Sequence, residues 1–177
     1  MKATGIVRRI DDLGRIVIPK EIRRTMRIRE GDPLEIYTDK DGEVIFKKYS
    51  PIGEMSSCAG GYCEVLSKLV DGGVVITDRD SIIAASGAPK KDLLSRRISP
   101  RMEQLMESRS LYKEETAQEA PAVLEGGEKY RAKLVSPVVV QGDVIGCVIF
   151  LQGEDNPLAT EVEVKLAVAS SGFLGRQ

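Results

Sequence analysis

The sequence predicts an α+β protein in two parts, a small β-rich module followed by a larger α+β domain with a central antiparallel sheet. Three observations predict this fold class. Short strand-like segments and turns alternate over the first fifty residues around a single helical stretch. A breaker segment, Ser-Pro-Ile-Gly at residues 50–53, comes next. Beyond it, two hairpin patterns lie between helical segments. We therefore place the domains at residues 1–52 and 53–177.

The first part has clear local signals. Its predicted elements are strands at 4–10 and 15–18 around a turn at 11–14, a helix at 20–28, and a hairpin of 33–39 and 43–49. Pro19 suits the first turn of the helix, on which Ile22 and Met26 share the predicted buried side. A unit this small with so few large apolar residues is marginal alone. We expect a second copy of the chain to complete its core.

The second part alternates helical and hairpin patterns. Its predicted elements are a helix at 54–70, a hairpin at 73–86, helical residues at 90–109 interrupted at Pro100, a hairpin at 131–151, and a final helix from about residue 157. The 131–151 hairpin has the strongest signal, because two β-branched runs meet at Gln141, Gly142 and Asp143. This order of elements predicts a central antiparallel sheet with helices packed on it.

Charge is unevenly divided along the chain. Residues 1–50 hold 12 Lys and Arg against 9 Asp and Glu, whereas the rest holds 14 against 18, so the two parts differ in sign. Residues 8–29 contain eight basic residues and only three acids, Asp11, Asp12 and Glu21. A local basic patch in a chain of net charge −1 favours a polyanionic partner.

Arginines around the first turn and the short helix form the candidate binding site. They are Arg8, Arg15, Arg23 and Arg24. A guanidinium group binds phosphates or guanine edges through two hydrogen bonds, and a two-fold dimer presents each group twice. The competing interpretation pairs these arginines with Glu21 and Glu30 in surface salt bridges, which contribute little.

The chain supplies little for catalysis or metal binding. It contains no His, which is the commonest general base and metal ligand. Cys58, Cys63 and Cys147 lack the number and spacing of a zinc site or a disulfide framework and suit reduced thiols. No phosphate-binding loop or dinucleotide motif is present. We expect no catalytic residue, no metal site and no cofactor.

The motifs of residues 4–49 follow a recognisable order. A strand TGIVRRI, an LGR turn, a V-I-P step, a helix with E-I-R-R and a strand beginning G-D-P-L-E-I succeed one another. In this order they resemble the AbrB-type swapped-hairpin DNA-binding family. With Ser-Pro-Ile at the junction, the two-part layout is similar to that of two-domain sporulation regulators in the family. The segments VVITDRDSIIAASG and VVVQGDVIGCVIF are similar to the GAF sensor fold.

The resemblance implies both a fold and a function. The fold is a dimeric swapped-hairpin AbrB-like β-barrel followed by a GAF-like α+β domain, which joins the dimers into a homotetramer. The partner is double-stranded DNA, selected by AT-rich shape, with contacts from Arg8, Arg15, Arg23 and Arg24 and a backbone contact from Arg9. The role is regulation of late, forespore-stage sporulation genes, as activator and repressor. For the GAF-like domain two alternatives stay open, sensing of an unidentified small molecule and oligomerisation without a ligand.

Two other functions compete with this interpretation. Antitoxins of the MazE type share the N-terminal fold, but they usually end in a short, acidic, poorly ordered tail, unlike the patterned residues 54–177. Some GAF-like domains are enzymes that use cysteines to reduce oxidised methionine. The cysteine spacing and the missing histidine argue against that chemistry here.

The sequence also bears on localisation. No stretch approaches the roughly 18 consecutive apolar residues of a membrane span, and no signal peptide is found. With DNA as the implied partner, we expect a cytoplasmic, nucleoid-associated protein of the forespore that has no membrane partner.

Overall fold

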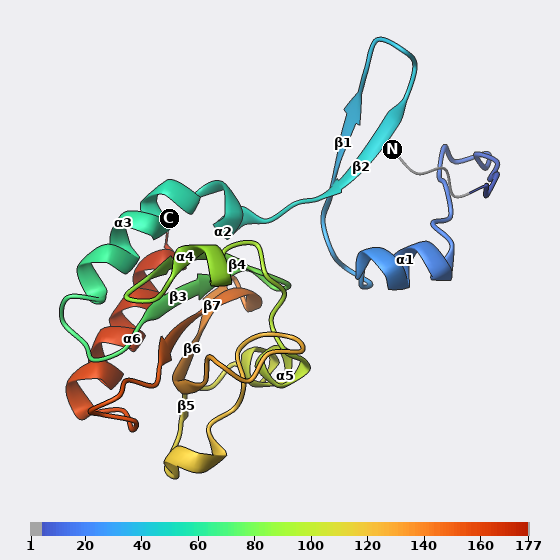
Figure 1. The fold of residues 1–177 in the computed structure, drawn as a ribbon. Helices are drawn as coiled ribbons and strands as arrows, with labels where there is room; N and C mark the ends of the chain where they lie inside the picture. Colours follow the sequence, from blue (N-terminus) through green and yellow to red (C-terminus); the bar gives the residue numbers. More distant parts are fainter. Residues whose placement is uncertain (1–4, 177) are drawn as a thin grey trace. The chain divides into compact units, whose positions relative to one another are not determined.

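The computed structural model of the chain describes residues 5–176 and divides into two compact units, Met1–Tyr49 and Ser50–Gln177 (Figure 1). Residues 50–52, which the sequence boundary assigns to the first domain, belong to the second unit by their contacts. Ile52 is fully buried there. None of the helices described between residues 5 and 176 is long and apolar enough to cross a membrane.

The first unit contains one short helix and one hairpin. They are α1 (Lys20–Met26), β1 (Leu34–Thr38) and β2 (Val44–Lys48). The strands pair antiparallel with Ile36 opposite Phe46, which confirms the predicted hairpin. Helix α1 begins after Pro19 as expected. It ends earlier than predicted because Arg27 adopts a left-handed conformation with φ of 52°.

The predicted strands at 4–10 and 15–18 are not strands in the structure. Their turn is closed by the hydrogen bonds from Asp11 N to Arg15 O and from Gly14 N to Asp11 O, both 3.0 Å. Beyond the turn, no strand ladder is found in residues 5–18, and residue 4 lies outside the described range. A strand needs a hydrogen-bonded partner along its length, and one chain does not supply it here.

The first unit, as far as it is described, has no hydrophobic core of its own. Within residues 5–49 only Pro19 is buried, and Val7 is 89% exposed. Met26, which its spacing predicts to be buried, is exposed. A groove of about 410 Å³ is lined by Met26, Ile28, Tyr37, Ile45, Phe46, Lys47 and Lys48. Apolar residues that the pattern assigns to a core therefore lie uncovered in the single chain.

The second unit is a five-stranded antiparallel sheet with helices on both faces (Figure 1). Its strands are β3 (Val74–Thr77), β4 (Ile82–Ser86), β5 (Tyr112–Lys113), β6 (Ala132–Val140) and β7 (Asp143–Leu151), in the spatial order β4-β3-β7-β6-β5. Its helices are α2 (Pro51–Glu54), α3 (Ser56–Leu66), α4 (Lys90–Leu93), α5 (Pro100–Glu107) and α6 (Glu161–Leu174), with a 3₁₀ turn at Ala117–Glu119. The central antiparallel sheet confirms the predicted fold class of this part.

Each face of the sheet has its own core. On one face, Val75 and Ile149 pack with Leu93 of α4 and Met102 of α5. On the other, Phe150 and its strand neighbours pack with residues of α3 and α6, among them Cys63, Leu66, Ala167 and Leu174. Because both faces are covered, the central strands are nearly continuous apolar runs rather than alternating ones.

Both predicted hairpins of this unit are confirmed, as β3 with β4 and as β6 with β7. Gln141 and Gly142 take positive φ values of 50° and 91° at the second turn, as a tight hairpin requires. The two long helices differ from expectation. Ser50 caps a separate turn, α2, before α3. In the 90–109 segment, Ser99 accepts a hydrogen bond from Met102 N and starts α5 at Pro100, which confirms the predicted break, while α4 ends already at Leu93.

Gly146 in β7 has no room for a side chain, since an added Cβ would lie 2.0 Å from Thr77 O. We expect Gly146→Ala to lower the free energy of unfolding by about 1–3 kcal/mol, because the backbones of β7 and β3 must separate. Gly60→Ala in α3 is the matched control, with nothing within 4 Å of the new Cβ. It should leave stability unchanged or raise it by up to about 1 kcal/mol. Urea unfolding measures both, and equal stabilities would contradict the prediction.

Candidate nucleic-acid interface

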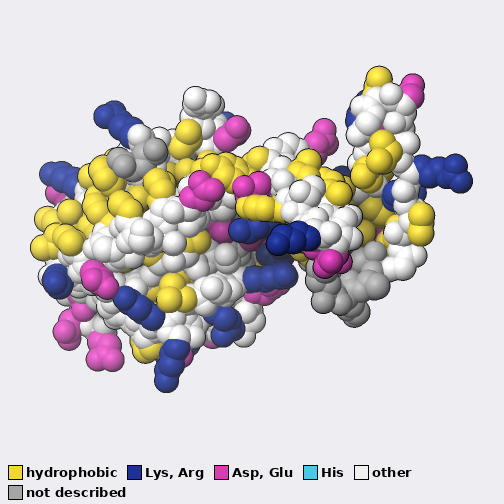
Figure 2. Space-filling view, turned by 90° about the horizontal axis from the view of Figure 1, so that it is seen from above, with side chains coloured by type: hydrophobic (Ala, Val, Ile, Leu, Met, Phe, Trp, Pro, Cys, Tyr) yellow, Lys and Arg dark blue, Asp and Glu magenta, His cyan; other side chains and the backbone are white. Residues whose placement is uncertain are grey.

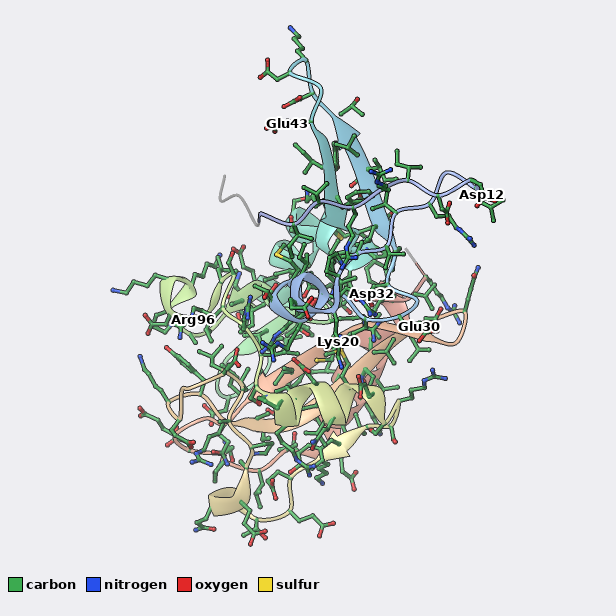
Figure 3. All side chains as sticks on the ribbon, turned by 90° about the vertical axis from the view of Figure 1, so that its right-hand side faces the viewer. Asp12, Lys20, Glu30, Asp32, Glu43 and Arg96 are labelled. Carbon is green, nitrogen blue, oxygen red and sulfur yellow. The ribbon has the colours of Figure 1, made fainter. Side chains whose placement is uncertain are left out.

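The turn at residues 11–15 is built around the side chain of Asp11. Its Oδ1 accepts hydrogen bonds from Leu13 N (3.0 Å) and Arg15 N (2.8 Å), and Gly14 supplies the positive φ of 75°. Asp12 marks this turn in Figure 3. The hairpin turn at residues 39–43 repeats the pattern, because Asp39 Oδ1 accepts from Asp41 N and Glu43 N, and Gly42 has φ of 80°. Residues 11–15 therefore form a hairpin-type turn, although no backbone hydrogen bonds pair the described segments on either side of it as strands.

Asp11 also holds the side chain of Arg15. Its Oδ2 lies 2.8 Å from Arg15 Nε, while the Arg15 side chain stays 68% exposed. The Arg15 backbone amide, followed by its guanidinium, lowers the pKa of Asp11 below its ordinary value. Because Nε makes this contact, the two Nη groups of Arg15 stay available for an anionic ligand. The sequence analysis did not identify Asp11 as a residue that positions Arg15. The signal was present, because an Asp that precedes an Arg by four residues, with a turn glycine between them, can reach it across the turn.

We expect Arg15→Gln to raise the pKa of Asp11 but to leave it below the ordinary value, because the amide hydrogen bonds of the turn remain. A carboxylate with a depressed pKa contributes stability above its unfolded-state pKa, and that contribution is lost as the pH falls through the folded-state pKa. The turn should therefore loosen only in acid. Carboxyl titration by NMR measures this, with Arg9→Gln as the control. An Asp11 pKa that is unaffected by Arg15→Gln would contradict the geometry.

Helix α1 presents two arginines on its last turn. Arg23 and Arg24 are both exposed, and their carbonyls accept hydrogen bonds from the residues that end the helix, Ile28 N at 2.8 Å and Arg27 N at 3.3 Å. Positive charge is favourable at a helix C-terminus. The two side chains therefore leave the same helical turn from consecutive positions, about 100° apart around the helix axis.

An ion pair braces the loop that follows α1. Asp32, labelled in Figure 3, has a buried side chain whose Oδ2 lies 3.1 Å from Lys48 Nζ and accepts from Arg29 N at 2.8 Å. Lys48 Nζ also donates to Arg27 O at 3.1 Å. These contacts connect the end of α1 to β2 and so fix the helix relative to the hairpin.

The predicted site residues are thus only partly brought together. The structure fixes Arg15 on its turn and places Arg23 beside Arg24, whereas no described hydrogen bond or ion pair holds Arg8 or Arg9 against them. The competing salt bridges are absent: within residues 5–176, neither Glu21 nor Glu30 pairs with any of these five arginines. Arg15 pairs with Asp11 instead.

The cysteines lie in the second unit. Cys58 is exposed on α3, whereas Cys63 and Cys147 are buried. Burial raises the pKa of each buried thiol to about 12, so both are protonated at neutral pH. Among the residues that the structure describes, no group of three or more His, Cys, Asp or Glu side chains is placed to hold a metal ion.

Comparison with known proteins assigns the chain to a family. A family described as "Stage V sporulation protein T C-terminal, transcription factor" matches residues 54–177. Stage V sporulation protein T of Bacillus subtilis (strain 168) is 51% identical over 177 residues, covering 100% of this chain and 98% of that protein. The chain belongs to the stage V sporulation protein T family. In this family member, residues 7–53 also match the family "Antidote-toxin recognition MazE, bacterial antitoxin".

Other known proteins resemble this stage V sporulation protein T family member over only part of its length. Transition state regulatory protein AbrB of B. subtilis is 43% identical over 88 residues, 50% of this chain and 82% of AbrB. A GAF domain from an Acinetobacter phosphoenolpyruvate-protein phosphotransferase matches with a TM-score of 0.53 at 14% identity, over 71% of this chain and 86% of that one. A type II free methionine-R-sulfoxide reductase from Thermoplasma acidophilum matches with a TM-score of 0.56 at 13% identity, over 71% and 93%. Such identities show the fold alone, and they confirm the predicted GAF-like fold.

Proposed function

We propose that this chain is a DNA-binding transcription regulator of sporulation genes, with the first unit as its DNA-binding part. The observation that carries the proposal is the full-length relationship to stage V sporulation protein T, together with a second part whose family is described as a transcription factor. The basic turn and helix of the first unit supply the chemistry, since exposed guanidinium groups bind phosphate.

Five arginines make the proposed DNA contacts, namely Arg8, Arg9, Arg15, Arg23 and Arg24. All five are exposed. They are well suited to phosphates and to the shape of a groove, so the protein selects AT-rich, deformable duplexes more than a strict consensus sequence. Arg15 is pre-oriented by Asp11, which reduces the conformational entropy lost on binding.

The first unit works as a homodimer. Its uncovered apolar residues, the groove beside the hairpin and the unpaired segments at 5–10 and 16–18 all support this proposal. A second copy that pairs with these segments would supply both the missing ladder bonds and the missing core.

The second unit joins dimers into a homotetramer. Helix α6 exposes Val162, Ala169 and Phe173 beside the half-buried Leu166. Helix α3 and the turn after it expose Val65 and Leu69 beside the half-buried Tyr62. Tyr62 stacks on Phe173 with ring centroids 5.4 Å apart, so the two groups of side chains form one surface, the α3/α6 face. Hydrophobic side chains gather over the second unit where α3 runs (Figure 2). An apolar patch of this kind marks an association surface.

We expect Val65→Lys/Val162→Lys to convert tetramers to dimers in sedimentation velocity, because it places two charges per chain in the α3/α6 face. Both side chains are exposed in the single chain, so the unit itself should fold normally. Leu111→Lys, also at an exposed apolar position but before β5, is the control and should leave the tetramer intact. A tetramer that persists in the double variant would show that another surface joins the dimers.

The cellular role follows from DNA binding. We propose that the protein acts on late, forespore-stage genes, as activator at some promoters and repressor at others, and that it is cytoplasmic and associated with the nucleoid. It acts by binding rather than by catalysis. The two buried, protonated thiols support this, because the thiolate is the reactive form of cysteine.

Small-ligand sensing is a separate proposal for the second unit. Side chains of the core fill the space between the sheet and helices α4 and α5. A pocket of about 530 Å³ opens instead at one end of β3, β4 and β7, between Gly72, Gly87, Arg131 and Asp155. We propose this pocket as the place where such a ligand would bind.

An antitoxin function has the match of residues 7–53 in its favour. It is the weaker proposal, because residues 50–176 form a folded domain with two hydrophobic cores instead of a short acidic tail. An antitoxin requires a toxin partner, and purification of the chain from its native host in complex with a small toxin would support this alternative.

Equilibrium binding to an AT-rich and a GC-rich duplex across a salt series tests the proposed function. Ten arginine contacts per dimer, about six to eight of them to phosphate, predict a log-log salt slope of about −5 to −7, and the shape readout predicts a preference for the AT-rich duplex. Binding that is weak and insensitive to salt would reject the proposal.

A further inference from the structure

A second concentration of positive charge lies in the second unit. Residues 90–101 (KKDLLSRRISPR) hold five basic residues, Lys90, Lys91, Arg96, Arg97 and Arg101, and one acid, Asp92. The rest of residues 51–177 holds 9 Lys and Arg against 17 Asp and Glu. We call residues 90–101 the second basic segment. Its net charge is +4, whereas the net charge of the remainder of residues 51–177 is −8.

Backbone hydrogen bonds hold the second basic segment against the sheet. Ser95 N donates to Ile82 O (2.9 Å) and Ile82 N to Arg96 O (3.0 Å), so the segment follows edge strand β4. Leu93 and Ile98, at either side of the arginine pair, are fully buried. The arginines therefore extend from a fixed backbone, and binding an anion would order only their side chains.

Most of the basic side chains of this segment are exposed and form few contacts with the rest of the unit. Arg96, Arg97 and Lys91 are exposed and make no side-chain hydrogen bond or ion pair within residues 5–176; Arg96 lies at the surface of the unit in Figure 3. Arg101 is exposed, contacts the side-chain oxygen of Gln104 at 3.4 Å, and interacts electrostatically with the carboxylate of Glu114. Lys90 has an exposed ion pair with Glu64 at 3.0 Å, and such pairs contribute little.

The single acid of the segment does not neutralise these cations. Asp92 Oδ2 accepts from Lys129 Nζ at 2.7 Å and from Tyr130 Oη at 2.8 Å. These two hydrogen bonds lower the pKa of Asp92 and direct its charge toward the 128–131 loop. Two residues on adjoining loops, Asp80 and Glu125, also form backbone hydrogen bonds with the segment. The segment thus keeps a net positive surface.

We propose that the second basic segment is a second DNA-binding surface, which contacts the phosphates that flank the site held by the first unit. The proposal rests on DNA binding by the first unit. Duplex DNA carries one negative charge per about 1.7 Å of its axis, so it complements a segment of exposed cations. Because both units belong to one chain, DNA held by one is presented to the other at high effective concentration. Contacts of this kind add affinity without reading sequence.

The test compares two duplexes with the full-length protein. One carries an AT-rich site in about 20 base pairs, and the other carries the same site centred in about 60 base pairs of neutral flanking sequence. The variant is Arg96→Gln/Arg97→Gln/Arg101→Gln. The matched control, Lys68→Gln/Lys113→Gln/Lys165→Gln, removes the same charge from exposed positions elsewhere on the second unit.

We expect the variant to bind the long duplex about tenfold more weakly than the control, with a salt slope less steep by about 2–3, and to bind the short duplex equally well. Equal behaviour of variant and control on the long duplex would overturn the proposal and leave the segment as a solvated face or a surface for an acidic protein. An equal loss on both duplexes would also overturn it, since flanking DNA would not be involved. If the wild type binds neither duplex, the function proposed above fails first.

Discussion

Replacing Arg23 and Arg24 together with alanine is expected to weaken binding to an AT-rich duplex by about 100- to 1,000-fold near 0.1 M salt. The two side chains are neighbours on the last turn of α1, which the Asp32–Lys48 ion pair connects to β2. A dimer loses four guanidinium contacts, and each charge-assisted contact to a phosphate contributes on the order of 1 kcal/mol at an exposed site. The salt slope should become less steep by about 3–4.

Controls separate this effect from loss of charge or of fold. Lys68→Ala/Lys165→Ala removes the same charge per chain from the second unit, outside the second basic segment, and should change affinity less than about threefold. Arg23 and Arg24 are exposed, so circular dichroism and the melting temperature of the double alanine variant should match the wild type. A folded variant that retains wild-type affinity would place the DNA-binding surface elsewhere.

Replacing Lys133 with alanine is expected to lower the free energy of unfolding by about 3–5 kcal/mol. Lys133 lies in β6 and is fully buried, and its Nζ is 2.6 Å from Glu163 Oε1. The same ammonium donates to Asp71 O (2.8 Å) and Asn156 O (3.3 Å). Removing it leaves a buried carboxylate without its counterion and two carbonyls without their donor.

The pair also determines how α6 begins. Glu163 Oε2 accepts from Thr160 N at 2.8 Å in a capping box, so one carboxylate closes the first turn of α6 and binds the strand beneath it. Lys133→Met/Glu163→Gln removes both charges while keeping side-chain length and the capping geometry. It should recover most of the lost stability, as is common when a buried pair is replaced as a whole.

Urea unfolding of the single and double variants distinguishes the two contributions. If Lys133→Ala were as stable as the wild type, other groups would have to compensate the charge of the buried Glu163 carboxylate. A double variant no more stable than the single one would mean that the ion pair and hydrogen bonds of the ammonium, and not the packing that methionine restores, provide the stabilisation.

Much of the local structure could be predicted because its signals act over a few residues. The hairpins at 73–86 and 131–151 have turn residues between apolar runs, and those turns form where expected. The helix ends were less accurate. Ser50 caps a short helix just before the helix predicted at 54–70, and α4 ends at Leu93, well before the break predicted at Pro100.

The candidate site was predicted in composition but not in arrangement. Arg15, Arg23 and Arg24 are exposed, as the amphipathic pattern indicates. Only the competing interpretation gave Arg15 an acidic partner, Glu21 or Glu30, whereas in the structure the turn residue Asp11 holds it. A carboxylate four residues away across a tight turn is closer in space than one on the next element. The distinctive charge of residues 90–101 was visible in the sequence, but its exposure depends on the packing of Leu93 and Ile98.

The sequence by itself determined the elements whose causes are local and the family to which the chain belongs: the hairpins, the Asp-x-x-Gly turns, the start of α1 after Pro19 and the division into two parts of opposite charge. Only the tertiary structure decided which polar groups meet across long separations. Lys133 and Glu163 lie in different elements, and nothing in the apolar run around Lys133 indicates a buried cation. Such a pair exists only when sheet and helix together exclude water, because a buried charge requires a counterion that only the folded chain brings within reach.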